Sequence, residues 1–347
     1  MTLEFCQALP KVDLHAHING SIRLSTLREL AAAATSDAVE RERMLQSVTV
    51  ARDDNRTLEE CFAIFKVIHA VVRTPDIVQR IAMECVLDFA YDGCRYLELR
   101  STPRRDVMTA RQYVKAVEDG IQAAQDTLAE NAITVRLLLS INRAQSVANA
   151  EATVDLAIEL ASRPTNKYIV GVELSGNPFE GRFADFQPAL TRARQAGLPV
   201  AVHAGEVDND AEMDEVLDFR PDRLGHALWL NKQHVQRIIK NRIPVEICPT
   251  SNRLTLKLKS FAEHPTLGIW LQNTHPISLC TDDSGVFQTT LSREYFVSAK
   301  HFSIGRQTLF GIVESSIASS FVDPTTKSSI HEEVQHARTD LECGRHL

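Results

Sequence analysis

The sequence predicts a single (β/α)8 barrel of the TIM type with a helical insertion after the first strand. Three observations lead to this prediction: short runs rich in Val, Ile and Leu, helical apolar spacing between them, and polar side chains where the runs end. The runs span residues 11–18, 94–101, 134–141, 168–175, 199–206, 222–230, 243–251 and 276–283. Most lack strict alternation, which is typical of parallel strands covered on both faces. Eight such strands separated by helices indicate a barrel.

The segments between the runs have the apolar spacing of helices. In 184–197, Phe186, Leu190 and Ala193 recur at helical intervals before Gly197, and glycine commonly ends a helix. This segment is therefore predicted to be one of the helices that alternate with the strands.

Two stretches depart from the regular alternation. Residues 21–93 form by far the longest gap between runs, and their apolar spacing, as in 58–72, predicts helices. We interpret 21–93 as an insertion over the barrel mouth. Residues 324–347 are a polar C-terminal tail that either forms a last helix or frays. Because no linker or repeat divides 1–347, we expect one domain.

The composition narrows the classes of function. With 44% hydrophobic and 24% charged residues, the chain has the composition of a globular protein. The 38 basic against 45 acidic residues give a net charge of −7, which argues against nucleic acid polymers and anionic membranes as partners. The seven cysteines are scattered without a Cys-x-x-Cys motif, and no run of 18 apolar residues occurs. We expect a cytoplasmic monomer that acts on a small molecule.

Polar residues lie toward the ends of four of the predicted strands, where barrel enzymes place their active sites. Two histidines that are two residues apart in a strand share one face, so both can reach the same ion. Histidine and carboxylate together are common zinc ligands. The polar residues concerned are His15, His17, His203, Glu206, His226, Asp282 and Asp283. Their convergence in a closed barrel predicts a metal site.

Each of these motifs has an ordinary structural interpretation when taken alone. His15 and His17 could be exposed or satisfied in the core, and the segment 282–285 has the composition of a turn. Glu206 could cap the following helix. The metal site is favoured because the motifs end different strands of one barrel.

Other motifs of metal and nucleotide enzymes do not fit. His331 and His336 are five residues apart, not the four of a zincin helix, so they are interpreted as a solvated face. The Pro-Cys-x-x-Cys element of cytidine deaminases is missing from the sequence. Neither a P-loop nor a Gly-x-Gly-x-x-Gly motif occurs, which disfavours ATP and dinucleotide chemistry.

The ordered set of motifs resembles the adenosine deaminase family of metal-dependent barrel hydrolases. The similarity runs from Lys11 to about Asp323. It is carried by His15-Ala16-His17, Ser175-Gly176, His203-Ala204-Gly205-Glu206, Leu224-Gly225-His226 and Thr281-Asp282-Asp283. The resemblance implies one zinc ion, Zn2+, bound by His15, His17, His203 and Asp282.

The resemblance also implies the roles of the remaining groups. Glu206 would donate a proton to purine N1, and the backbone amide of Gly176 would reach N3. His226 and Asp283 would handle the attacking water and the purine edge. These roles agree with the chemistry, because attack at C6 pushes electrons onto the ring and requires an acid near N1.

Two departures from the typical adenosine deaminase point to a nucleotide substrate. Asn19 replaces an Asp on the nucleoside side of the site, and residues 99–105 resemble the adenosine-deaminase-like branch that hydrolyses N6-methyl-AMP to IMP and methylamine. A phosphate dianion would be repelled by an Asp carboxylate and attracted by an Arg guanidinium. Both changes therefore favour a substrate that carries a phosphate. The substrate contacts implied are His17, Asn19, His69, Ser101, Thr102, Pro103, Arg104, Asn142, Gly176 and Asp283. Residues 101–105 could otherwise be a solvated loop.

Three alternatives remain open from the sequence. The same site could deaminate adenosine or adenine. A binuclear amidohydrolase could use Glu173 to bridge two ions. A binding protein on a degenerate barrel is the third alternative, although every chemical role has an occupant in the sequence.

Overall fold

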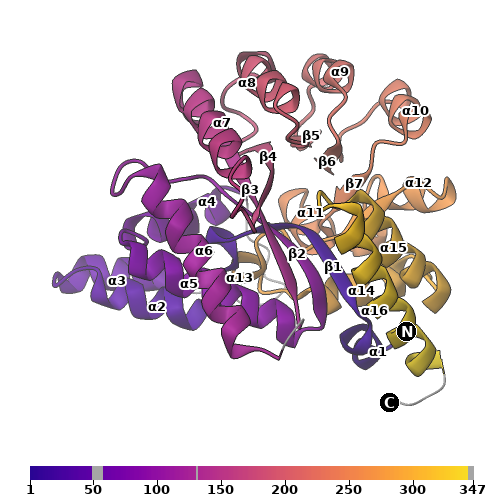
Figure 1. The fold of residues 1–347 in the computed structure, drawn as a ribbon, viewed down its shortest axis with the longest axis horizontal. Coiled ribbons are helices and arrows are strands. Elements are labelled where there is room, and N and C mark those ends of the chain that lie inside the picture. The colour runs from indigo at the N-terminus through magenta and orange to yellow at the C-terminus, as the bar shows by residue number, and fades with distance from the viewer. Residues whose placement is uncertain (49–57, 130–131, 343–347) are drawn as a thin grey trace.

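A computed structural model describes residues 1–48, 58–129 and 132–342 of the chain. Eight parallel strands pair in the order β1 to β8 (Figure 1). They are β1 (Lys11–His17), β2 (Cys94–Ser101), β3 (Thr134–Asn142), β4 (Ile169–Ser175), β5 (Val200–Ala204), β6 (Arg223–His226), β7 (Val245–Ile247) and β8 (Ile277–Leu279). A parallel bridge between Ala16 and Asp282 joins the chain after β8 to β1. The sheet is thus a nearly closed barrel, and the predicted fold is confirmed.

Helices surround the strands as an outer layer (Figure 1). Those of the barrel layer and the C-terminal part are α6 (Ala110–Thr127), α7 (Val147–Ala161), α8 (Phe183–Gln195), α9 (Asp210–Phe219), α10 (Lys232–Asn241), α11 (Pro249–Thr255), α12 (Leu267–Gln272), α13 (Ser284–Phe287), α14 (Leu291–His301), α15 (Arg306–Ser319) and α16 (Pro324–Glu342). The helix predicted over 184–197 is α8. Local signals start several helices; for example, Thr109 and Gln112 form a capping box at α6.

Helices make up most of the described part of the segment 21–93, as predicted, with short connections between them; residues 49–57 lie outside the described part. Its helices are α2 (Leu24–Ala33), α3 (Ala38–Ser47), α4 (Leu58–Val71) and α5 (Pro75–Tyr91), and α1 (Leu3–Ala8) precedes β1. Helix α5 packs along α6, whereas α4 contacts the short turn of helix η1 (Asn19–Ser21) that directly follows β1. Helix α4 of the insertion therefore contacts the segment that follows β1.

The C-terminal tail forms a helix, α16, as far as Glu342; residues 343–347 lie outside the described part. His331 and His336 are exposed on it, as predicted. A second short helical turn is η2 (Phe261–Glu263). The cysteines of the described ranges are buried and form no disulfide there.

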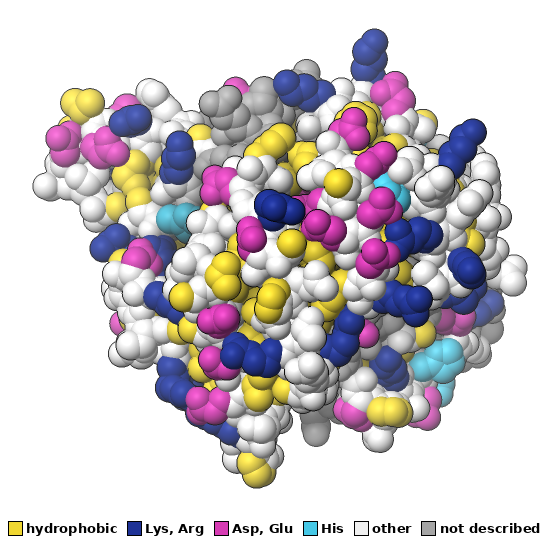
Figure 2. Space-filling view, turned by 90° about the horizontal axis from the view of Figure 1, so that it is seen from above, with side chains coloured by type: hydrophobic (Ala, Val, Ile, Leu, Met, Phe, Trp, Pro, Cys, Tyr) yellow, Lys and Arg dark blue, Asp and Glu magenta, His cyan; other side chains and the backbone are white. Residues whose placement is uncertain are grey.

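No helix among the described residues combines the length and apolar character needed to cross a lipid bilayer. On the face seen from above in Figure 2, Lys and Arg side chains are interspersed with Asp and Glu. Charges of the two signs thus alternate over this surface.

Candidate active site and metal centre

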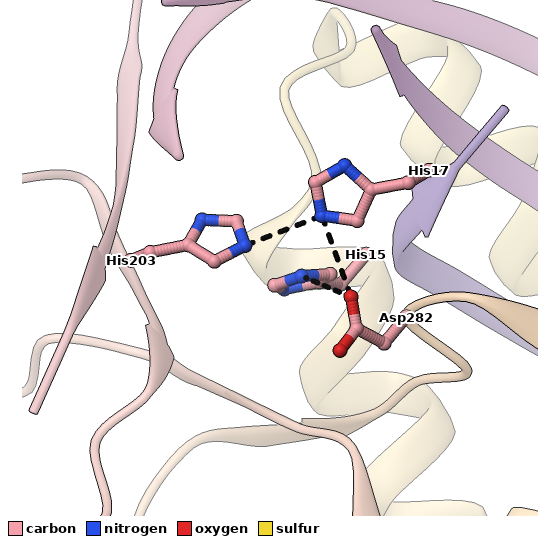
Figure 3. Close-up of side chains that lie close together, drawn as sticks. All are labelled: His15, His17, His203 and Asp282. Atoms are coloured by element: carbon pink, nitrogen blue, oxygen red, sulfur yellow. Dashed lines mark hydrogen bonds and ion pairs between the residues drawn. The ribbon is translucent and has the colours of Figure 1, made fainter. Parts of the chain in front are cut away.

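Four predicted metal ligands come together at the ends of β1, β5 and β8 (Figure 3). One ligand atom from each of His15, His17, His203 and Asp282 lies within 4.8 Å of the others. His15 and Asp282 are buried, and the His17 side chain is 19% exposed. Residues far apart in the sequence thus form one compact donor set, as the strand-end pattern predicted.

The spacing of these atoms fits a tetrahedral ion. The Nε2 atoms of His17 and His203 are 3.2 Å apart, and Asp282 Oδ1 is 3.4 Å from the Nε2 atoms of both His15 and His17. Metal–ligand distances of about 2.0–2.1 Å in a tetrahedron place ligands about 3.3 Å apart. His15 Nε2 is also buried without a hydrogen-bond partner. The donor set therefore fits a metal cofactor such as Zn2+.

Two of the three imidazoles of the donor set, those of His17 and His203, are held in the neutral form that binds metals. Burial and the neighbouring rings of His15, His226 and His17 hold the pKa of His203 well below its usual value. Burial likewise lowers the pKa of His17 to about 4, against the opposing carboxylates of Glu173 and Asp282. Both rings can therefore offer a free nitrogen at neutral pH.

The backbone after β8 lets two adjacent carboxylates enter the same site. Asp282 has a φ of 61°, in the left-handed region that residues other than glycine seldom occupy. This breaks the alternation of a strand, so Asp282 joins the donor set while Asp283 packs against Gly20. A Cβ on Gly20 would lie 1.6 Å from Asp283 Oδ1. The strain marks a position where site geometry overrides backbone preference.

The three predicted catalytic groups line the space beside the donor set. His226 Nε2 is 3.8 Å from Glu206 Oε1 and 4.0 Å from Asp282 Oδ2. Glu206 Oε2 and Asp283 Oδ1 are buried without hydrogen-bond partners. Unpaired buried carboxylate oxygens are costly, so a ligand that satisfies them would bind favourably here.

Burial raises the pKa values of both carboxyl groups, and Glu206 retains its proton near neutral pH. Burial, reinforced by the charge of Asp282, raises the pKa of Glu206 to about 8. Burial and the carboxylates of Asp282, Glu173 and Glu206 raise the pKa of Asp283 well above its usual value. A protonated carboxyl can donate a hydrogen bond or a proton, which an ionised one cannot.

Several predicted substrate contacts gather after β1 and β2. Ser101 Oγ is 2.6 Å from Tyr113 Oη, and the side chain of Asn19 lies near the same phenol. Asn19 Oδ1 is buried without a hydrogen-bond partner. Thr102 is partly exposed next to the buried Pro103. The structure thus brings Asn19 close to the loop that follows β2.

Arg104 of this loop forms hydrogen bonds with other residues of the protein. Arg104 Nε donates to Asp106 Oδ1 at 2.8 Å, and Arg104 Nη1 donates to the carbonyls of His69 and Val72 at 2.9 and 3.0 Å. The Arg104 side chain is 10% exposed and that of Asp106 is 61% exposed. Arg104 therefore ties the loop to the end of α4, and a phosphate at this guanidinium would compete with Asp106.

Gly176 and Asn142 lie against each other at the ends of β4 and β3. Gly176 has a φ of 106°, and a Cβ there would lie 2.6 Å from Asn142 Oδ1. Only glycine fits this conformation and contact without strain. Asn142 Oδ1 accepts a hydrogen bond from Ala144 N at 2.9 Å, which fixes its side chain.

Comparison with known proteins agrees with this geometry. The family model described as adenosine deaminase matches residues 10–337. The chain belongs to the adenosine deaminase family. It is 37% identical to the N6-mAMP deaminase of Arabidopsis thaliana, over 94% of this chain and 97% of that protein. It is 36% identical to the N6-methyl-AMP deaminase of Homo sapiens, over 96% of this chain and 95% of that protein.

Solved structures of this branch of the adenosine deaminase family have the same fold. The crystal structure of Arabidopsis ADAL complexed with IMP superimposes with a TM-score of 0.90 at 36% identity, covering 97% of this chain and 99% of that chain. A complex of Arabidopsis ADAL with GMP gives a TM-score of 0.90 at 37% identity, covering 96% and 98%.

A buried ionic network beneath the donor set was not anticipated from the sequence. Glu246 Oε2 accepts from His15 Nδ1 at 2.7 Å and from Arg100 Nη2 at 3.0 Å, and its Oε1 accepts from Arg223 Nε at 2.6 Å. All four side chains are fully buried. The bond at Nδ1 turns Nε2 of His15 toward the other ligands, as outer partners do in metal sites. Charged residues inside apolar strands were the signal that could have revealed the network.

Glu173 belongs to the same network. One oxygen accepts from Arg100 Nη1 at 2.7 Å and the other from Ser140 Oγ. Its carboxylate also lies 3.5 Å from His203 Nδ1 and 3.9 Å from His17 Nδ1, on the side of each ring away from the other ligands. These contacts engage Glu173 behind two imidazoles, which disfavours the bridging role considered for it in a binuclear site.

A hydrogen-bond relay fixes the orientation of His226, and the sequence analysis missed it. Backbone amides of Thr266 and Leu267 donate to His264 Nδ1, so the proton of this ring lies on Nε2, 3.1 Å from Asn252 Oδ1. Asn252 Nδ2 in turn lies 3.0 Å from His226 Nδ1 and donates to it. This pattern assigns the proton of neutral His226 to Nε2, which faces the donor set.

Proposed function

We propose that this chain is a zinc-dependent deaminase of purine nucleotides that converts N6-methyl-AMP to IMP and methylamine. The observation that carries the proposal is the donor set of His15, His17, His203 and Asp282 beside a protonated Glu206. The names of the relatives, which cover almost the whole chain, support this substrate. We further propose a cytoplasmic monomer.

The proposed reaction uses groups at opposite edges of the purine ring. Zinc held by the four ligands would make hydroxide available near neutral pH. Glu206, which carries a proton below about pH 8, would protonate N1 as attack at C6 pushes electrons onto the ring. The Nε2–H of His226 would orient the attacking oxygen by donating a hydrogen bond. Asp283 would hold the purine edge, and the amide of Gly176 would meet N3.

The nucleotide preference rests on the loop after β2. Ser101 and Asn19 lie near the same phenol, that of Tyr113, and Thr102 and Arg104 follow Ser101 in the loop. At position 19 the chain has an amide in place of a carboxylate. We propose that the phosphate binds here and displaces Asp106 from Arg104. Contacts from Arg104 to the carbonyls of His69 and Val72 would keep the guanidinium in place, and the helices of 21–93 would cover this side of the mouth.

A substrate panel tests the proposal directly. We expect IMP and methylamine from N6-methyl-AMP at a higher kcat/KM than the products of AMP, N6-methyladenosine, adenosine and adenine. Arg104→Ala should raise KM for N6-methyl-AMP about tenfold to a hundredfold, the worth of one or two charge-assisted hydrogen bonds, and should change N6-methyladenosine little. Arg105→Ala is the matched control. Faster turnover of free nucleosides would instead identify an adenosine deaminase.

A further inference from the structure

A cavity of about 390 Å3 lies where α11, η2 and α14 pack against one another. Its volume is within the range of roughly 300–1,000 Å3 that is usual for small-molecule pockets. None of the described residues that line it is acidic, and five of the nine are basic: Arg253, Lys259, Arg293, Lys300 and His301. Such a concentration of basic side chains on a chain of net charge −7 indicates a site for an anion.

The two lysines are the groups most accessible to a bound anion. Lys259 and Lys300 are exposed, and within the described part of the chain neither forms an ion pair. Glu263 does not line the cavity, and its Oε2 accepts from the backbone N of Lys259 at 3.0 Å. Arg253 and Arg293 have other partners within the protein, so the lysines are the expected anion contacts.

His301 lies in the same positive environment. Burial and the positive charges of Lys300 and Arg253 lower the pKa of His301. Its Nδ1 is 3.5 Å from the hydroxyl oxygen of Ser260, which also lines the cavity. An anion beside this ring would interact favourably with the surrounding charges and could accept a hydrogen bond from the ring or the hydroxyl.

Two aromatic rings add an apolar surface to the cavity. The guanidinium carbon of Arg253 lies 5.3 Å from the centre of the Phe261 ring, and Lys300 Nζ lies 5.9 Å from the centre of the Phe296 ring. Both rings are partly exposed. Proteins that bind nucleotides without reading the base combine basic side chains for the phosphates with aromatic rings for the base. The cavity therefore fits a nucleotide better than a bare phosphate ion.

The walls of the cavity also belong to elements that orient the proposed active site. Arg253 directly follows Asn252, which donates to His226 in the relay. Arg293 directly precedes Glu294, which accepts a hydrogen bond from the start of α11. A ligand that contacts η2 and α14 together would restrain the elements that hold this relay.

We propose that this cavity binds a nucleoside triphosphate, with the phosphates at Lys259, Lys300 and His301 and the base against the aromatic rings. A triphosphate is favoured over a monophosphate because the three groups come from two separate segments, the turn before η2 and the end of α14. The site is separate from the donor set, and its existence does not depend on the proposed function.

Calorimetric titration of the zinc-loaded protein with UTP tests the proposal. UTP is the probe because a pyrimidine cannot offer a purine edge to Glu206, and Mg2+ is supplied so that UTP does not extract zinc. We expect one UTP per chain, with an affinity that falls as salt concentration rises. Replacing Lys259 and Lys300 together by Ala should lower the affinity about fivefold to thirtyfold. The double replacement of the exposed Lys232 and Lys240 of α10 by Ala is the matched control.

Two further measurements locate the ligand and identify its base contact. Hydrogen exchange should slow in residues 256–263 and 291–301 when UTP is added. Phe296→Leu keeps an apolar side chain but removes the ring, so it should lower the affinity for UTP about fivefold or more and leave that for tripolyphosphate unchanged.

The contrary results are equally specific. Equal loss of affinity in the two double variants, or slowed exchange only in the loop after β2, would show that UTP does not bind in this cavity. Tripolyphosphate binding as tightly as UTP would overturn the assignment of a nucleotide. Because no measurement here depends on turnover, failure of the proposed deaminase activity would leave these results unaffected.

Discussion

Single residues at the barrel mouth have chemical states that their residue type alone does not predict. Glu206 is acidic by type, yet burial and a nearby carboxylate raise its pKa to about 8. His226 could carry its proton on either nitrogen, and the relay through His264 and Asn252 assigns it to Nε2. The proposed acid and the proposed water-orienting donor are thus defined by their neighbours.

Replacing Glu206 by Gln should separate proton donation from metal binding. Because Glu206 is not among the ligand atoms, Glu206→Gln is expected to retain one metal ion per chain. Loss of a general acid should lower kcat by about 10²–10⁴-fold. Steady-state kinetics with N6-methyl-AMP and metal analysis measure both effects. A variant with wild-type kcat would exclude Glu206 as the proton donor.

Asn252→Asp tests the relay to His226. A carboxylate cannot donate to Nδ1, so His226 would move its proton there and lose the Nε2–H that faces the donor set. We expect kcat to fall about tenfold to a hundredfold, as for other outer partners of metal sites, with KM little changed. Nitrogen-15 NMR of the ring reports the tautomer.

The exposed Asn273→Asp is the matched control for this substitution. If Asn252 had only a structural role, Asn252→Asp would change a different set of measurements. The melting temperature would fall while the tautomer and kcat stayed as in the wild type.

At the scale of elements, one short helix connects the site to the outer layer. Helix α11 carries Ser251, which donates to Asp282 Oδ2 at 2.7 Å, and Asn252 of the relay. The start of α11 is fixed by Glu294 of α14, whose carboxyl accepts from the amide N of Thr250 at 2.8 Å. The position of α14 thus helps to fix Ser251 and Asn252, which orient Asp282 and His226.

Glu294 also makes stability depend on pH. Burial, partly offset by the hydrogen bonds from Thr250 and Thr289, raises its pKa to about 7. The folded protein therefore holds a proton that the unfolded chain releases above about pH 4.5. The free energy of unfolding should fall as pH rises from about 4.5 to about 7, by on the order of 1–3 kcal/mol.

Glu294→Gln should remove this component of the pH dependence. Denaturant unfolding of the wild type and the variant at pH values from 5 to 8 measures it. The exposed Glu151→Gln on α7 is the control and should follow the wild type. Parallel curves for wild type and Glu294→Gln would contradict a shifted pKa at this position.

At the scale of the whole molecule, the donor set connects segments that are nearly 270 residues apart. His15, His203 and Asp282 come from β1, β5 and the chain after β8. The unfolded chain does not hold these side chains together, so an ion bound by all of them would stabilise the folded barrel. One ion at a hundred times its Kd would contribute about 2.7 kcal/mol to the free energy of unfolding.

Removal of the metal by a chelator should therefore lower Tm by several degrees, and added zinc should restore it. His15→Ala should abolish this response, whereas the exposed His331→Ala should retain it. Metal analysis should find one ion per chain. Two tightly bound ions would favour the binuclear alternative instead.

The sequence by itself determined the barrel and which polar residues gather at its mouth. Runs of Val, Ile and Leu and helical spacing are local properties, so all eight strands were located from the sequence, although β6, β7 and β8 are shorter than the runs that predicted them. The convergence of His15, His17, His203 and Asp282 also followed, because parallel strands of a barrel end at one face.

Only the tertiary structure decided the partners of these groups. Glu246 beneath His15 and Asn252 beside His226 are side-chain contacts whose geometry no local pattern encodes. The same holds for an open cavity beside Glu206, whose lining residues come from four separate segments of the chain. Hydrogen bonds and pKa shifts depend on distances of a few ångströms between residues remote in sequence, and packing sets these distances.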